Sequence, residues 1–240
     1  MRFYLDENIF RENNIFYYEK KDKIIKIKER DWHLYLSEYG WNKLNKKWIV
    51  KLNKLNKLTN ERKKNSLFGV LDCGGDGDCL FHCISYALND EEYTETEKLR
   101  ENLADYITED KFNDIIEIYR ILNESDDFEE IWDPDSITFE DFKSLLKEGG
   151  NEYWGDFFIL NLLKEYLNIN IIILYSNDIT NKYYHYPTFD TYDEHKNTIV
   201  LLYENEIHFQ LVGHFSGNQM NTKFNKENIP EEIINMVKIR

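Results

Sequence analysis

Cysteine and long apolar runs are scarce in this sequence of 240 residues, and each scarcity excludes a class of protein. There are three cysteines, all within residues 73–83, and an odd, crowded set is no disulfide framework, so a reducing compartment is favoured. The most apolar short run, Ile171–Tyr175, is far below membrane-spanning length. The first ten residues carry two acids before any apolar run, unlike a secretory signal. We therefore expect a soluble, intracellular, cytoplasmic protein.

Charge divides the chain into two unequal parts. Apolar residues at 42% and aromatics at 15% indicate a folded core, and a net charge of −15 argues against nucleic-acid binding by the whole chain. Residues 1–66 carry a net charge of +8, whereas residues 67–240 carry −23. A basic head on an acidic body leaves nucleic-acid binding by the head as a minor alternative that depends on its lysines and tryptophans.

The basic head is expected to be mainly helical. Lys23–Lys28 alternates like a strand, but Leu52, Leu55 and Leu58 recur every three residues, as on one face of a helix. We interpret this as an amphipathic helix packed on the body, with docking to a partner or an anionic surface as the alternative. The predicted organisation is a basic N-terminal extension (1–65) packed on or beside the core, a main domain (66–216) and a C-terminal tail with a short helix (217–240).

The body has helices first and most strands late, which predicts a mixed α/β (α+β) domain with a small central β-sheet flanked by helices. A capping box at Thr94 and Glu97 is predicted to open one helix. The pattern predicts helices over 79–88, 94–109, 111–122, 138–147 and 156–167, strands over 67–71, 169–175, 198–203 and 207–212, and a terminal helix from 229. The last two strands are expected to form a hairpin.

The segment GGDGDCLFHCISYAL, residues 74–88, has the chemistry of a cysteine nucleophile. Its glycines allow positive φ and close approach to a substrate. Cys79 begins a predicted helix, where unpaired N–H groups and the positive end of the dipole stabilise a thiolate. The N–H groups of the loop, at Gly77 and Asp78, are candidates to stabilise an oxyanion. The rival interpretation, zinc bound by His82 and the three cysteines, fits no known ligand spacing, so no metal is expected.

The thiol needs a base, and six histidines compete: His33, His82, His185, His195, His208 and His214. His208 begins the last predicted strand, in IHFQLV, and a base at the end of a rigid strand suits proton transfer with Cys79. Strand alternation places Gln210 on the same face as His208, which makes Gln210 the expected residue to orient the imidazole.

Asp76–Phe81, DGDCLF, resembles the D-G-[ND]-C-L-[FY] signature of the ovarian-tumour (OTU) family of cysteine deubiquitinases, and HFQLV at 208–212 resembles its terminal H-[FYW]-x-x-[VL] strand. LRENLADYI, at 99–107, and the WGD segment at 154–156 also resemble family segments, so the resemblance runs from about Leu67 to His214. The "GDCLFH" variant is similar to OTU proteins of large DNA viruses, which would place the protein in a host cytoplasm or a virion.

The resemblance implies a papain-type cysteine protease fold and a role for each matching residue. Cys79 would be the nucleophile, His208 the general base, and Asp76 the motif aspartate counted with the active site. The implied reaction hydrolyses isopeptide or peptide bonds at the C-terminus of ubiquitin, polyubiquitin or a ubiquitin-like modifier through a thioester, without a cofactor.

The sequence departs from the family pattern at one position. Many members carry Asp or Asn where Gln210 stands, and a neutral amide cannot stabilise an imidazolium by charge. Cysteine enzymes tolerate a neutral partner because their ion pair is partly formed beforehand. The sequence therefore predicts a working deubiquitinase, and the alternative is an OTU-fold module that binds ubiquitin or another partner with weak or no catalysis.

Overall fold

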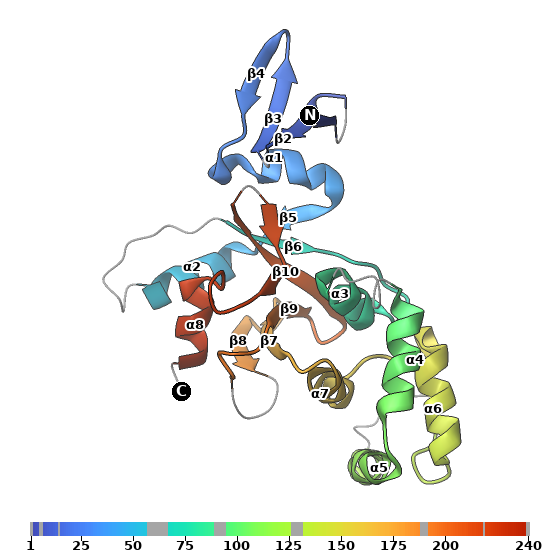
Figure 1. Ribbon diagram of the computed structural model, residues 1–240. Coiled ribbons are helices and arrows are strands. Elements are labelled where there is room, and N and C mark those ends of the chain that lie inside the picture. Colours follow the sequence, from blue (N-terminus) through green and yellow to red (C-terminus); the bar gives the residue numbers. More distant parts are fainter. Residues whose placement is uncertain are drawn as a thin grey trace.

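The computed structural model describes residues 2–4, 7–13, 15–56, 67–88, 95–125, 132–187, 192–217 and 219–238. It has a central mixed sheet with helices on both faces and a separate small sheet at the N-terminal end (Figure 1). The mixed α/β architecture predicted from the sequence is confirmed. In the described parts of the chain, no helix is both long and apolar enough to cross a bilayer.

The central sheet has the strand order β5-β6-β10-β9-β7-β8, with β11 added to β10 and β12 to β9. Its strands are β5 (Trp41–Lys43), β6 (Phe68–Leu71), β7 (Asn170–Asn177), β8 (Lys182–Pro187), β9 (Thr198–Glu204), β10 (His208–Ser216), β11 (Gln219–Asn221) and β12 (Lys223–Phe224). Strands β7 and β9 are parallel, and the other pairs are antiparallel. The predicted hairpin is confirmed as β9 and β10, whose turn has positive φ at Asn205 and Glu206.

Alternating side chains of the central strands fill two separate cores. Ile171, Ile173 and Leu211 face a core made with helices α3 (Cys79–Leu88) to α7 (Phe157–Tyr166). Ile172, Leu174 and Val212 face a core made with α2 (Lys46–Asn56) and α8 (Glu231–Lys238). The period of two along each strand produces this division. Because both faces are covered, β7 is buried throughout, which explains why its sequence is a continuous apolar run.

The helices lie close to the predicted ranges. They are α2 (Lys46–Asn56), α3 (Cys79–Leu88), α4 (Thr96–Tyr106), α5 (Glu109–Glu124), α6 (Phe139–Glu148), α7 (Phe157–Tyr166) and α8 (Glu231–Lys238), with short turns α1 (His33–Leu36), η1 (Glu29–Asp31), η2 (Ser37–Tyr39) and η4 (Gly150–Glu152). Thr108 and Thr138 cap α5 and α6 through their side chains. The predicted capping box at Thr94 lies outside the described residues.

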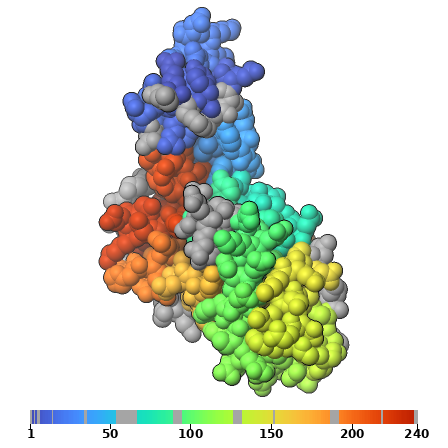
Figure 2. Space-filling view, turned by 45° about the vertical axis from the view of Figure 1, so that its right-hand side comes forward, coloured from blue at the N-terminus to red at the C-terminus, as the bar shows by residue number. Residues whose placement is uncertain are grey.

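The N-terminal extension contains the strand expected near Lys23–Lys28 but otherwise differs from the mainly helical segment expected from the sequence. Four antiparallel strands come first: β1 (Phe3–Tyr4), β2 (Ile9–Glu12), β3 (Ile15–Lys20) and β4 (Lys23–Lys26). Lys21 and Asp22 both have positive φ and form the two-residue turn between β3 and β4. Aromatic and β-branched residues favour strands here over the helical interpretation. This small sheet stands at one end of the molecule (Figure 2).

The second half of the extension belongs to the main body. β5 pairs with β6 in the central sheet, and α2 packs against α8. Trp48 and Leu52 are fully buried, so α2 contributes to the second core. The rest of the predicted leucine stripe, the Leu55 side chain and Leu58, lies outside the described part.

Candidate active site

The loop that joins β6 to α3 carries the predicted nucleophile. Cys79 is the first residue of α3, as expected. Gly74 and Gly77 have positive φ, and so does the non-glycine Asp76, at 58°. At Gly74 a side chain would also be crowded, since a Cβ would lie 3.1 Å from the ring of His82. The loop therefore depends on a left-handed backbone at three positions to present Cys79.

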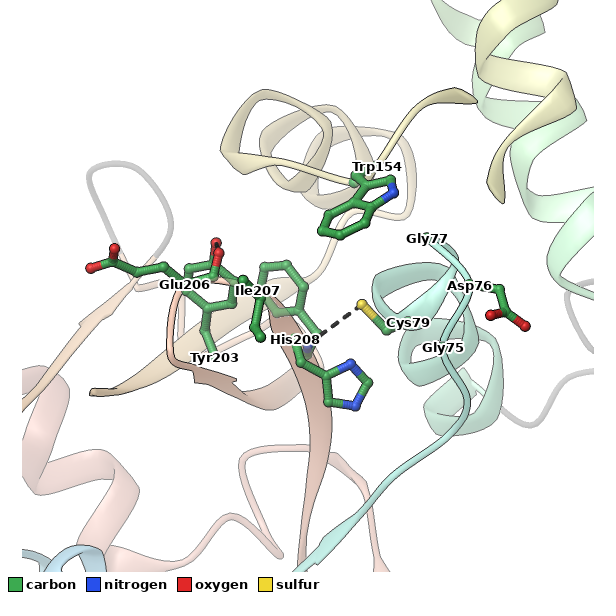
Figure 3. A pocket seen from close by; sticks show the side chains of 11 residues that line it. Gly75, Asp76, Gly77, Cys79, Trp154, Tyr203, Glu206, Ile207 and His208 are labelled. Carbon is green, nitrogen blue, oxygen red and sulfur yellow. Dashed lines mark hydrogen bonds between the residues drawn. The ribbon is translucent and has the colours of Figure 1, made fainter. Parts of the chain in front are cut away.

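Cys79 and His208 meet at the junction of α3 and β10. The backbone N–H of Phe209 donates to the Cys79 Sγ at 3.5 Å, and the His208 ring lies beside the sulfur (Figure 3). A hydrogen bond to Cys79 raises the pKa of His208 to about 9, with a further contribution from Asp72 and against the effect of burial. A histidine with this pKa is mostly an imidazolium at neutral pH, which is the state that pairs with a thiolate.

The structure pairs His208 with Asp72, a residue that the sequence analysis did not select. The His208 Nε2 lies 3.1 Å from the Asp72 Oδ1, which leaves Nδ1 for Cys79. No hydrogen bond joins Gln210 to His208 in the described part of the chain. The predicted orienting role of Gln210, which required its carbonyl to accept the Nδ1–H, does not match this geometry.

The register of β6 against β10 explains the difference. Leu71 lies opposite Leu211, so continuing the pairing by one residue places Asp72 opposite Gln210, on the same face as His208. The partner of His208 thus lies on the expected face of the sheet, but it follows β6 and is not part of β10. Asp72 can be recognised as a partner of His208 only when the pairing of β6 with β10 is known.

The other predicted loop residues take different positions. The Asp76 side chain is exposed and points away from Cys79, so the structure does not bring it to the Cys79–His208 pair (Figure 3). The Asp78 N–H donates to the Gly75 carbonyl at 3.2 Å within the loop. The predicted donor role of the Asp78 N–H is therefore wrong. Among the hydrogen bonds of the described residues, none uses the N–H of Gly77 or Cys79, so Gly77 stays a candidate donor to an oxyanion and Cys79 replaces Asp78.

A cleft of ≈ 420 Å³ opens at Cys79. Its walls include Trp154 and Ile207, whose exposed fractions of 46% and 63% are large for apolar side chains. The complete lining is Gly75, Asp76, Gly77, Cys79, Trp154, Gly155, Tyr203, Glu206, Ile207, His208 and Phe209. Exposed apolar walls around a nucleophile suit an extended chain more than a small polar molecule.

The WGD segment forms one wall of this cleft. Asp156 caps α7, accepting the N–H groups of Phe158 and Ile159 at 2.9 Å each. It also accepts the Tyr119 hydroxyl, and burial raises the pKa of Asp156. At Gly155 a Cβ would lie 2.5 Å from Leu80 on the nucleophile helix, so this wall can approach α3 only with glycine there. The motif therefore shapes the site through packing.

The residues of the alternative zinc site have other partners. The Cys83 thiol is fully buried and donates to the Phe209 carbonyl at 3.5 Å, and the His82 ring lies 2.7 Å from the Thr96 hydroxyl. No group of three or more His, Cys, Asp or Glu side chains in the described residues is arranged to hold a metal ion.

The sequence and the fold of this chain are similar to those of known proteins. The family model described as OTU-like cysteine protease matches residues 74–215. Similar solved structures include the OTU domain of OTUD1 (16% identity, 70% of this chain and 94% of that chain, TM-score 0.44) and the viral OTU domain protease from Farallon virus (20%, 63% and 86%, 0.45). Another is an OTU deubiquitinase from Wolbachia pipientis wMel bound to ubiquitin (17%, 62% and 96%, 0.44). No curated protein matches the sequence.

Proposed function

Because the chain belongs to the OTU-like cysteine protease family, we propose that it is a deubiquitinase that uses Cys79 as nucleophile and His208 as its acid–base partner. The observation that carries the proposal is the pairing of Cys79 with a histidine whose pKa is raised to about 9 and whose far nitrogen is held by Asp72. This arrangement brings a thiol nucleophile and its acid–base partner together in one site.

The reaction begins with attack of the Cys79 thiolate on the carbonyl carbon of the substrate's C-terminal glycine. The N–H groups of Gly77 and Cys79 stabilise the oxyanion that forms. The His208 imidazolium gives its proton to the departing amine as the C–N bond breaks, which leaves a Cys79 thioester. Neutral His208 then takes a proton from water, whose oxygen attacks the thioester, and the thiolate leaves.

Asp72 is a positioning residue in this scheme. Its carboxylate accepts from the Nε2–H of His208, so it fixes the ring with Nδ1 toward sulfur and stabilises the imidazolium. Because about 60% of the Asp72 side chain is exposed, its electrostatic contribution is smaller than that of a buried carboxylate.

The shape of the cleft supports a substrate that ends in glycines. Gly75, Gly77 and Gly155 contribute no side chains to the lining, and Trp154 and Ile207 are its exposed apolar walls. Glycines in the lining let the backbone approach a polypeptide end without side chains closely, and the C-terminus of ubiquitin has this property. The net charge of −23 over residues 67–240 complements a basic substrate surface.

A ubiquitin probe with an electrophile at its C-terminus tests the proposal. We expect one covalent adduct at Cys79 in the full chain and none in Cys79→Ala, with intact-protein mass spectrometry as the readout. An adduct that forms equally in Cys79→Ala, or no adduct in a protein that is folded by circular dichroism, contradicts it. Retention of ubiquitin without an adduct identifies the alternative, a binding module without catalysis.

A further inference from the structure

An ion pair between buried Arg100 and partly exposed Asp78 adjoins the nucleophile. Arg100, on α4, is only 1% exposed. Its Nε donates to the Asp78 Oδ1 at 2.7 Å, and the other guanidinium nitrogens donate to the carbonyls of Leu146 and Tyr153 at 3.2 Å each. The guanidinium carbon lies 3.8 Å from the centre of the Phe81 ring. All polar edges of the guanidinium are thus engaged inside the protein.

Asp78 is the residue before Cys79, and its groups hold the first turn of α3. Its carbonyl accepts the N–H of His82 at 2.8 Å, and its Oδ1 also accepts the N–H of Gly150 at 3.1 Å. The ion pair therefore connects the start of the nucleophile helix with α4 and with the end of α6.

The backbone near the end of α6 makes room for the guanidinium. Gly149 has a φ of 65°, and a Cβ there would lie 2.3 Å from the Arg100 Nε. Tyr153, whose carbonyl accepts from Arg100, immediately precedes Trp154 in the wall of the cleft. The same arginine thus fixes both sides of the site, the nucleophile loop and the WGD wall.

This ion pair is a weak source of stability, because removing the Arg100 charge from water offsets much of its attraction to Asp78, whose side chain is 25% exposed. Burial indeed lowers the pKa of Arg100, against the effect of Asp78. A benefit other than stability would explain why this pair lies one residue from the reactive sulfur.

We propose that the Asp78–Arg100 pair sets the charge environment of Cys79, with Arg100 as a positioning residue that cancels the negative charge of Asp78 beside the thiolate. This inference deepens the proposed function, since it concerns the reactivity of the same cysteine. An uncompensated carboxylate at Asp78 would disfavour the thiolate, whereas an uncompensated guanidinium at Arg100 would favour it.

Charged and titratable groups reach the surroundings of Cys79 from several elements. They are His208 from β10, Asp72 from the loop after β6, Tyr203 from β9, Glu206 from the turn before β10, Asp76 and Asp78 from the loop itself, Cys83 from α3 and Arg100 from α4. His208 and Arg100 are the cations of this set. Substitutions at Asp78 and Arg100 leave His208 and Asp72 unchanged, so they isolate the contribution of the pair.

The rate of Cys79 alkylation by iodoacetamide as a function of pH tests the proposal on the full chain. Mass spectrometry of the Cys79 peptide separates this site from the half-buried Cys73. We expect the midpoint of the profile to move down by about half to one pH unit in Asp78→Asn and up by a similar amount in Arg100→Gln. The double variant, which removes both charges, should return close to the midpoint of the unmodified protein.

A purely structural role predicts a different pattern. Both single variants would then slow alkylation, without midpoint shifts of opposite sign, and that result overturns the proposal. If Arg100→Gln does not fold, Asp78→Asn and the charge-retaining Arg100→Lys decide. A lowered midpoint in Asp78→Asn with an unchanged one in Arg100→Lys supports the proposal, and any other combination contradicts it. Alkylation requires no ubiquitin, so this test succeeds or fails independently of deubiquitinase activity.

Discussion

Replacing Asp72 by asparagine removes the negative charge that lies 3.1 Å from the His208 Nε2 and keeps the size of the side chain. Without that charge the imidazolium is less stable, so the pKa of His208 should fall from about 9. The active thiolate–imidazolium pair is lost at high pH when His208 loses its proton. The alkaline limb of the pH profile of kcat/KM should therefore move to lower pH.

The magnitude follows from distance and exposure. At 3.1 Å, Coulomb's law gives about 1.3 kcal/mol in a water-like dielectric and about 5 kcal/mol at an effective dielectric of about 20. Because Asp72 is 60% exposed, the lower limit applies, and measured exposed pairs contribute about 1 kcal/mol or less. This corresponds to a shift of about 0.7 pH units and a loss of about fivefold in kcat/KM on the alkaline limb, against about 10⁴-fold for the buried aspartate of a serine protease.

Cleavage of a fluorogenic ubiquitin C-terminal amide between pH 6 and 10 provides the measurement, with Gln210→Ala as the matched control. Gln210 lies on the same strand face as His208 without a hydrogen bond to it among the described contacts, so Gln210→Ala should retain kcat/KM within about twofold. An unmoved alkaline limb in Asp72→Asn, or a larger loss in Gln210→Ala than in Asp72→Asn, would refute the reasoning.

Two further predictions concern stability. Gly155→Ala should lower the free energy of unfolding by about 1–3 kcal/mol in urea titrations, because the added Cβ would lie 2.5 Å from Leu80. Gly75→Ala is the control and should change the free energy of unfolding little, because a Cβ at Gly75 meets open space. Equal effects of the two substitutions would contradict the packing argument. The raised pKa of His208 contributes stability that is fully present below pH 6.5 and is lost as pH rises through about 9. Cys79→Ala should flatten this decline, and identical pH dependence in both proteins would contradict the assignment.

The sequence predicts the residues whose signals are local. Cys79 follows a glycine-rich loop at a helix start, and His208 follows a three-residue turn at a strand start, so both could be located by pattern. Asp72 and Arg100 could not be selected in this way. Asp72 reaches His208 through strand register, and Arg100 reaches Asp78 through the packing of α4 on α3, which are both long-range properties.

Of the four N-terminal strands, β4 matches the strand pattern of Lys23–Lys28, and the other three were missed for a different reason. The regular leucines of the following helix dominated the interpretation of the basic segment, and the turn at Lys21–Asp22 has no glycine to mark it. Tertiary context decides which local preference prevails in such a segment.

The pairing of β5 with β6 affects how the protein can be shortened. Removing residues 1–65 would take away the outermost strand on that side of the central sheet and leave the backbone N–H and C=O groups of β6 open to other chains. It would also uncover the apolar surface that Trp48 and Leu52 bury. A fragment starting at residue 66 should therefore aggregate, whereas one starting at residue 29 keeps both β5 and α2 and is the better choice for crystallisation.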